Sequence, residues 1–154
     1  MWSSYFFCVI NHRPVAMGRP RFNRYTGRAY TPEKTRKALA EVAHNIAQAM
    51  EKQHCRQIDK TTPIHVDLIF VHPRPKAHKK TTERSPKTTK PDIDRLVNTY
   101  FDGMTKGGLL DDNHITNLKA EDLYGATDEE PHVIINVSIW RGTDEKTWLH
   151  HSDI

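Results

Sequence analysis

The chain has 154 residues, of which 36% are hydrophobic and 27% are charged, and its formal net charge is +4. This length predicts one domain with a hydrophobic core, and no apolar run approaches the roughly 18 residues of a membrane span. Cys8 and Cys55 form neither a redox motif nor a metal-binding motif, and the N-terminus lacks the basic start and apolar core of a signal peptide. We therefore expect a cytoplasmic protein without disulfide bonds.

The first predicted strand covers Tyr5–Asn11, which is rich in aromatic and β-branched residues. A basic loop without any acidic residue follows over residues 13–28, where two prolines and two glycines exclude a regular helix. Phe22 and Tyr25 lie between its arginines, which are Arg13, Arg19, Arg21, Arg24 and Arg28. Guanidinium groups can bond two phosphate oxygens at once, and aromatic rings stack on unpaired bases. The loop therefore suggests nucleic-acid binding; the alternative is a solvated loop that its prolines stiffen.

The first helix is predicted to start with Thr31 as N-cap and Pro32 in the first helical position, and to run to about Gln53. Its apolar stripe consists of Leu39, Val42, Ala43, Ile46, Ala49 and Met50. A second strand is expected over Pro63–Val71, where apolar and polar residues alternate as in a half-buried strand.

A second basic segment covers residues 72–90, with three prolines and four threonines that argue against regular structure. One acidic residue, Glu83, stands against seven cationic side chains: Arg74, Lys76, Lys79, Lys80, Arg84, Lys87 and Lys90. Read alone, the segment is a solvated linker that is mobile without a partner. Because it leads directly into carboxylates, we instead expect it to grip a phosphodiester backbone beside a metal site.

A second helix is predicted between Pro91 and the glycine pair at residues 107 and 108. Its apolar residues recur with the helical period of 3.6 and are Ile93, Leu96, Val97, Tyr100, Phe101 and Met104. Asp92 and Asp94 lie in its first turn, where carboxylates complement the helix dipole. Asp111 and Asp112 follow the glycine pair.

Carboxylates that gather in one place need cations to neutralise them, and hard divalent cations prefer oxygen ligands. Provided that the fold returns the second pair of acids to the first, we expect a site for Mg²⁺ or Mn²⁺. The simpler interpretation is that each pair only reflects the ordinary chemistry of a helix start or a turn.

Beyond residue 91 the charge balance reverses, with ten acidic residues against three basic residues between Asp92 and Glu130. Two more strands are predicted in this part of the chain, over His114–Leu123 and His132–Trp140. The resulting order β-α-β-α-β-β indicates a small α+β domain, with a mixed sheet covered on one face by two main helices.

These motifs resemble the RusA family of Holliday-junction resolvases, and especially its phage and prophage members. The resemblance rests on Lys90-Pro91-Asp92-Ile93-Asp94, Leu96, Phe101-Asp102 and Asp111-Asp112, with support from Gly18-Arg19-Pro20-Arg21 and Tyr30-Thr31-Pro32-Glu33. It covers about Tyr5 to Trp140 and implies an endonuclease domain over residues 1–141, followed by a C-terminal tail over residues 142–154 in which Trp148 can pack back onto the body.

The resemblance implies a homodimeric, Mg²⁺-dependent endodeoxyribonuclease that nicks four-way DNA junctions symmetrically in recombination and repair. By motif position, the catalytic metal ligands would be Asp92, Asp94 and Asp112, with Asp111 assisting. The DNA-binding residues would be Arg19, Arg21, Arg24, Arg28, Lys79, Lys80, Lys90 and Arg95.

The chain departs from the family pattern at two positions, because Arg95 replaces a frequent asparagine and Asn98 replaces a common lysine that is thought to help catalysis. Lys90, Arg95 or Lys106 would have to supply that positive charge. A catalytically inactive protein that binds junctions or other nucleic acids is therefore the alternative function. A nucleotide-sugar transferase with a D-x-D motif fits poorly, because so small a domain lacks an α/β half for the sugar donor.

Overall fold

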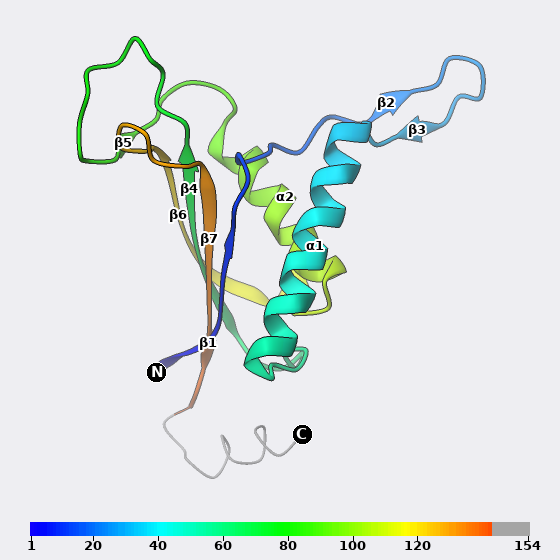
Figure 1. Cartoon of the computed structure of the whole chain (residues 1–154). Helices are drawn as coiled ribbons and strands as arrows, with labels where there is room; N and C mark the ends of the chain where they lie inside the picture. The colour runs from blue at the N-terminus through cyan, green and yellow to red at the C-terminus, as the bar shows by residue number, and fades with distance from the viewer. Residues whose placement is uncertain (143–154) are drawn as a thin grey trace.

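A mixed sheet of five strands forms one layer of the molecule in a computed structural model that describes residues 1–142 (Figure 1). The strands are β1 (Trp2–Ile10), β4 (Ile64–His72), β5 (Ser85–Pro86), β6 (Ile115–Tyr124) and β7 (His132–Trp140), in the spatial order β1-β7-β4-β6-β5. β4 and β6 are parallel, whereas the other neighbours in the sheet are antiparallel. The sheet is therefore mixed, as predicted.

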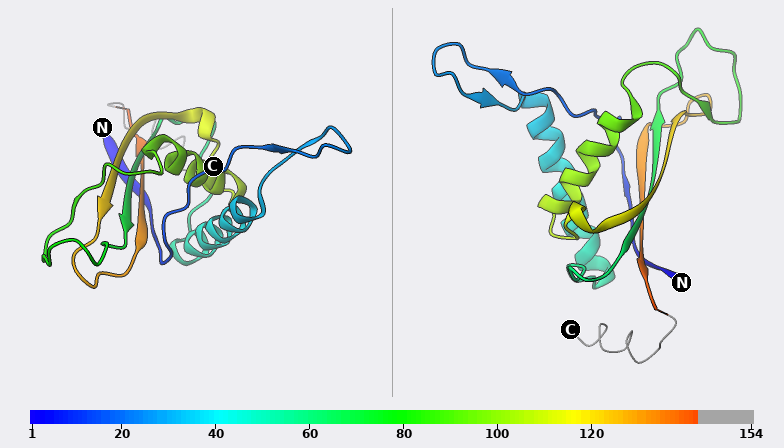
Figure 2. Two further views of the ribbon diagram at one scale, coloured as in Figure 1. Left: turned by 90° about the horizontal axis from the view of Figure 1, so that it is seen from above. Right: turned by 180° about the vertical axis from the view of Figure 1, so that it is seen from behind.

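Two helices, α1 (Glu33–Gln53) and α2 (Ile93–Lys106), cover the same face of this sheet (Figure 2). The core lies between the two layers and includes Val42 and Ile46 from α1, Leu96 and Tyr100 from α2, and Phe70 from β4, all fully buried. The helices approach closely at Gly103, where a Cβ atom would lie 2.7 Å from Cβ of Val42. A side chain there would force the helices apart, so glycine is required by packing.

The predicted order of main strands and helices is confirmed, and so are both helix faces, except that Ile93 at the start of α2 is 39% exposed. Some predicted boundaries were wrong. β1 begins at Trp2 and not at Tyr5, because its first residues pair with the end of β7. Pro32, not Thr31, is the N-cap of α1, and no side chain caps that helix. Each remaining strand lies within one residue of its predicted range.

Both basic segments contain strand structure that the sequence did not predict. Residues 21–30 form a β-hairpin in which β2 (Arg21–Phe22) pairs with β3 (Ala29–Tyr30), and this hairpin projects beyond the N-terminal end of α1 (Figures 1 and 2). In the second segment, the short strand β5 pairs with the end of β6. A 3-10 turn, η1 (Asp112–His114), precedes β6.

No helix in the described residues is long and apolar enough to cross a membrane. Cys8 is buried in the core and Cys55 is half-buried, and both are free thiols. The predicted tail after residue 142, with Trp148, lies outside the part of the chain that the structure describes.

Candidate metal and nucleic-acid site

The carboxylates of Asp92 and Asp94 are held at the N-terminal end of α2. Asp92 is the N-cap residue, with φ −69° and ψ 148°, and Asp94 lies in the first turn. Both residues are exposed, and neither side chain has a hydrogen bond or ion pair within residues 1–142. Two unengaged carboxylates on one helical turn can offer several oxygen ligands to a hard cation.

The second acidic pair lies at the other end of α2. Asp111 accepts a hydrogen bond from the backbone N–H of Asn113 at 3.1 Å, which occupies one of its oxygens as an N-cap of η1. Asp112 is half-buried, and its carboxylate has no partner among the described residues. Asp112 therefore has more carboxylate oxygen available to a metal ion than Asp111, which is consistent with the expectation that Asp112 is the ligand.

The two pairs of acids do not meet within one chain. α2 has 14 residues, which corresponds to a length of roughly 21 Å. Beyond it, the loop stays at that end of α2, because the carbonyl of Leu109 accepts a hydrogen bond from the N–H of Ile58 at 2.8 Å, near the far end of α1. The described residues accordingly contain no group of three or more potential metal ligands. The expectation that the fold returns Asp112 to Asp92 and Asp94 was therefore wrong for a single copy.

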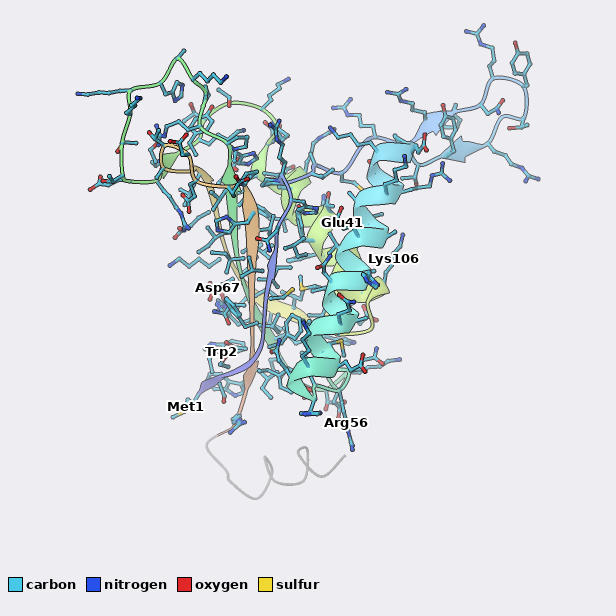
Figure 3. The ribbon with its side chains drawn as sticks, in the orientation of Figure 1. Met1, Trp2, Glu41, Arg56, Asp67 and Lys106 are labelled. Carbon is cyan, nitrogen blue, oxygen red and sulfur yellow. The ribbon has the colours of Figure 1, made fainter. Side chains whose placement is uncertain are left out.

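The structure also shows which of the candidate residues Lys90, Arg95 and Lys106 could supply a positive charge near Asp94. Asn98, which stands where the resemblance led us to expect a lysine, is exposed one turn beyond Asp94. Lys106 is the last residue of α2 and so lies at the opposite end of the helix (Figure 3). Lys90 is exposed and Arg95 half-buried, and both are close in sequence to the two carboxylates.

The segment before the β2–β3 hairpin is tied to the first turns of both helices. The N–H of Met17 donates to the carbonyl of Arg95 at 3.0 Å, and the N–H of Gly18 donates to Oγ1 of Thr35 at 3.0 Å. The hydroxyl of Tyr100, whose pKa is raised by burial, accepts from the N–H of Val15 at 3.1 Å. The root of the hairpin is therefore fixed beside Asp94.

The large side chains of the hairpin are all cationic or aromatic. Residues 21–30 are all exposed, and Figure 3 shows its side chains standing clear of the body of the molecule. Arg19, Arg21, Arg24 and Arg28 have no acidic partner within residues 1–142. Free guanidinium groups without carboxylates are suited to bind phosphates.

The 73–91 segment, which follows β4 and contains most of the second basic segment, divides its cations between the surface and the interior. Lys79 and Lys80 are exposed and line an open hollow of about 540 Å³ together with Arg74 and Arg84. Arg74 donates to the carbonyl of Gly125 at 2.7 Å, which fixes one wall of the hollow. Arg84 forms a fork-shaped pair with Glu129, with Nη2 of Arg84 at 2.7 Å from Oε2 of Glu129, and this pair lowers the pKa of Glu129 to about 2.

Lys87 is the residue in this segment that the sequence misassigned to the cationic surface. Its side chain is only 5% exposed, and its ammonium group donates to the carbonyls of Thr89 at 2.6 Å and Lys90 at 3.0 Å. The carboxylate of Asp122, on β6, lies 4.0 Å from the same ammonium group. The buried ammonium group of Lys87 thus holds the backbone of the residues that directly precede Asp92.

Asp122 also accepts a hydrogen bond from His72, at 2.6 Å between Oδ1 and Nε2. Burial lowers the pKa of His72, and the nearby Lys87 cation adds to this effect. A neutral imidazole that donates its N–H to Asp122 satisfies both groups. Sequence reasoning missed this cluster, because His72 lies one residue beyond the predicted strand 63–71 and only the parallel pairing of β4 with β6 brings it close to Asp122.

An α+β domain that holds free carboxylates beside an arginine-rich projection has the features of a protein that acts on nucleic acid. The sequence profile of the family described as endodeoxyribonuclease RusA matches residues 11–138. The chain belongs to this family, whose members are junction-resolving endodeoxyribonucleases that depend on divalent metal ions.

One curated relative is the uncharacterized protein YqaN of Bacillus subtilis (strain 168). It is 31% identical over 137 residues, a match that covers 84% of this chain and 92% of the relative. The similarity therefore extends over nearly the whole of both proteins.

Proposed function

We propose that this protein is a Mg²⁺-dependent endonuclease that resolves four-way DNA junctions by paired symmetric nicks. The observation that carries the proposal is the fixed position of the cationic hairpin beside two unengaged carboxylates, through the 3.0 Å hydrogen bond between Met17 and Arg95. The arginines would bind the sugar-phosphate backbone, and Asp92 and Asp94 would stand where that backbone passes.

The free carboxylates fit a hard divalent cation better than a soft one, because every candidate ligand atom is a carboxylate oxygen. A bound Mg²⁺ would lower the pKa of a coordinated water and stabilise charge on the reacting phosphate. Asp92 and Asp94 would supply the ligands from one turn of α2, and Asp112 would complete the set. Mn²⁺ has the same ligand preference and can replace it.

Because Asp112 lies at the opposite end of α2, we infer that it serves the site of a second copy in a homodimer. A two-fold axis that crosses α2 near its middle aligns the two α2 helices antiparallel, so the start of each helix meets the end of the other. The free outer edge of β6 offers a surface for such pairing, because β5 covers only Leu123 and Tyr124. The resulting dimer has two sites, which accounts for two symmetric cuts.

Metal-dependent nicking of a synthetic four-way junction, compared with a linear duplex of the same arm sequences, tests the activity. We expect paired cuts in the junction with Mg²⁺ and none with EDTA. Asp94→Asn should keep junction binding and lose cleavage. Cleavage by Asp94→Asn would contradict the assignment, and binding without cuts in either metal would favour the inactive junction-binding alternative.

Mixing two inactive variants tests whether the site is shared between copies. If Asp112 acts in the partner's site, a heterodimer of Asp94→Asn with Asp112→Asn keeps one intact site, so the mixture should regain nicking of one strand. The matched control is a mixture of Asp92→Asn with Asp94→Asn, which leaves a defect in both sites and should stay inactive. Failure of the first mixture to regain activity, with heterodimers present, would refute the shared site.

A further inference from the structure

We propose that the β2–β3 hairpin inserts Phe22 and Tyr25 against unstacked base pairs at the branch point of a DNA junction. The site is this aromatic pair, and its ligand is the open face of a base. The inference rests on the proposed function, because it names the part of a branched substrate that the hairpin reads. It goes beyond phosphate binding, which the four arginines can perform without any aromatic side chain.

The exposure of these rings is the first argument. Tyr25 is 92% exposed and Phe22 is 74% exposed, the two largest exposed fractions among the aromatic residues of the described chain. Neither ring contacts another aromatic ring within residues 1–142. Large apolar groups that are grouped on a projection and left uncovered are typical of a binding surface, because their exposure to water is unfavourable.

The turn that carries Tyr25 is held in one conformation by hydrogen bonds that do not involve the Tyr25 ring. Oδ1 of Asn23 accepts hydrogen bonds from the N–H groups of Tyr25 at 2.9 Å and Thr26 at 3.3 Å. Gly27, which has φ +68°, donates to the carbonyl of Asn23 at 2.8 Å, and the N–H of Asn23 donates to the carbonyl of Arg28 at 2.9 Å. An ordered turn presents its aromatic side chain with little further loss of entropy on binding.

The charges around the rings identify the partner. Arg21, Arg24 and Arg28 flank the two aromatic residues, and residues 13–32 contain no acid. An apolar protein surface or a second copy of this hairpin would meet unpaired positive charge there, whereas nucleic acid neutralises it. Aromatic rings between phosphate-binding cations are the features that hold unstacked bases.

Intact duplex cannot use the rings, because its base faces are covered by stacking. A branch point interrupts stacking and leaves base faces accessible. The hairpin root is fixed beside the first turn of α2 through Met17 and Arg95, so a hairpin seated at the branch point keeps the carboxylates near the phosphates that flank it. The aromatic pair would therefore favour junctions over duplex, while the arginines bind both.

Fluorescence anisotropy in EDTA measures this preference without cleavage. For the double variant Phe22→Ala, Tyr25→Ala, we expect the ratio of junction affinity to duplex affinity to fall by about tenfold or more, the order of factor that base stacking supplies. Phe7→Ala is the matched control, because Phe7 is 48% exposed and belongs to β1, outside the hairpin. It should leave the ratio unchanged.

A junction with 2-aminopurine beside the branch point reports stacking directly. Saturating wild-type protein should change its fluorescence, and saturating double variant should not. Two results would overturn the proposal. One is an affinity ratio that the double variant leaves unchanged, including the case of an equal loss on both DNAs, and the other is a wild-type ratio near one. Conversion of a wild-type dimer to a monomer in the double variant, seen by sedimentation, would also overturn it, because the rings would then contact a second copy.

The outcome is separable from that of the proposed activity, since no metal is present. A protein that binds junctions through the hairpin but never nicks them would refute the endonuclease and leave the aromatic contact standing. The melting temperature is expected to stay the same in the double variant, because neither ring contributes to the core.

Discussion

The β2–β3 hairpin leaves all its arginines on the surface, whereas the 73–91 segment commits Arg74, Arg84 and Lys87 to bonds within the protein. In the sequence both are basic, proline-containing segments of irregular pattern. The difference lies in the acids that surround them. The hairpin has no carboxylate to pair with, while the 73–91 segment lies against β6 and the loop after it, which contribute Asp122 and Glu129. A basic segment therefore becomes a ligand-binding surface or a structural anchor according to its neighbours in space.

The largest expected effect comes from removing the buried anchor. Lys87→Met leaves two backbone carbonyls and Asp122 without their cation, and loss of one member of a buried charged group costs about 3 kcal/mol or more. We expect the free energy of unfolding in urea to fall by about this amount. Junction cleavage should fall as well, because Thr89 and Lys90 directly precede the proposed ligand Asp92.

Lys79→Met is the matched control for Lys87→Met, since Lys79 is an exposed lysine of the same segment. Its stability should equal that of the wild type. Equal stability of both variants would mean that Lys87 is not an anchor, and the contrast between the two basic segments would lose its main support.

The hairpin should behave in the opposite way. The triple variant Arg21→Gln, Arg24→Gln, Arg28→Gln should bind duplex on the order of 100-fold more weakly near 0.1 M salt and flatten the slope of log affinity against log salt by about 2.7, if each arginine contacts one phosphate. Its melting temperature should not change, because these side chains have no carboxylate partner in the described residues.

Arg56→Gln provides the control for Arg24→Gln as a single variant, because Arg56 is exposed at the opposite end of the molecule (Figure 3). We expect weaker DNA binding from Arg24→Gln alone. Equal losses from both would indicate a diffuse effect of net charge and no specific role for the hairpin.

The smallest expected effect is that of Arg84→Gln on stability. Arg84 holds the pKa of Glu129 at about 2, below the ordinary glutamate value of 4.5. A carboxyl group whose pKa is lower in the folded state stabilises the protein above pH 4.5, and this contribution is lost as the pH falls toward 2. Because Arg84 is 36% exposed, solvent screens the pair and we expect less than about 1 kcal/mol.

Thermal melts of wild type and Arg84→Gln between pH 2 and 7 would measure this contribution. The difference in melting temperature should be largest above pH 4.5 and should vanish near pH 2. A difference that does not depend on pH would mean that Arg84 stabilises the segment through its packing and not through Glu129.

Periodic apolar patterns predicted the fold, because they report which face of each element is buried. The pattern from Ile93 to Met104 predicted α2 to within two residues, and alternation predicted β4 and β7. The hairpin was missed because Arg21–Phe22 and Ala29–Tyr30 are wholly exposed two-residue strands, which leave no buried face to read.

The candidate ligands were also found in the sequence, but their arrangement was not. Asp92, Asp94 and Asp112 are adjacent to helix-start and turn signals. These signals do not show that α2, which is 14 residues long, holds Asp112 apart from Asp92 and Asp94 within one copy. Lys87 was misassigned for a related reason. Sequence composition counts a lysine as surface charge, and only the packing against Asp122 shows that this one is buried.

The strand order β1-β7-β4-β6 places the last strand of the described chain between the first strand and the rest of the sheet. While the protein is being synthesised, β1 therefore has no neighbouring strand until β7 has left the ribosome, and the sheet cannot be completed earlier. Such pairing between distant parts of a chain slows folding. It also means that a chain truncated before residue 132 would lack the strand that joins β1 to β4, so an incomplete copy should be unable to form the complete sheet.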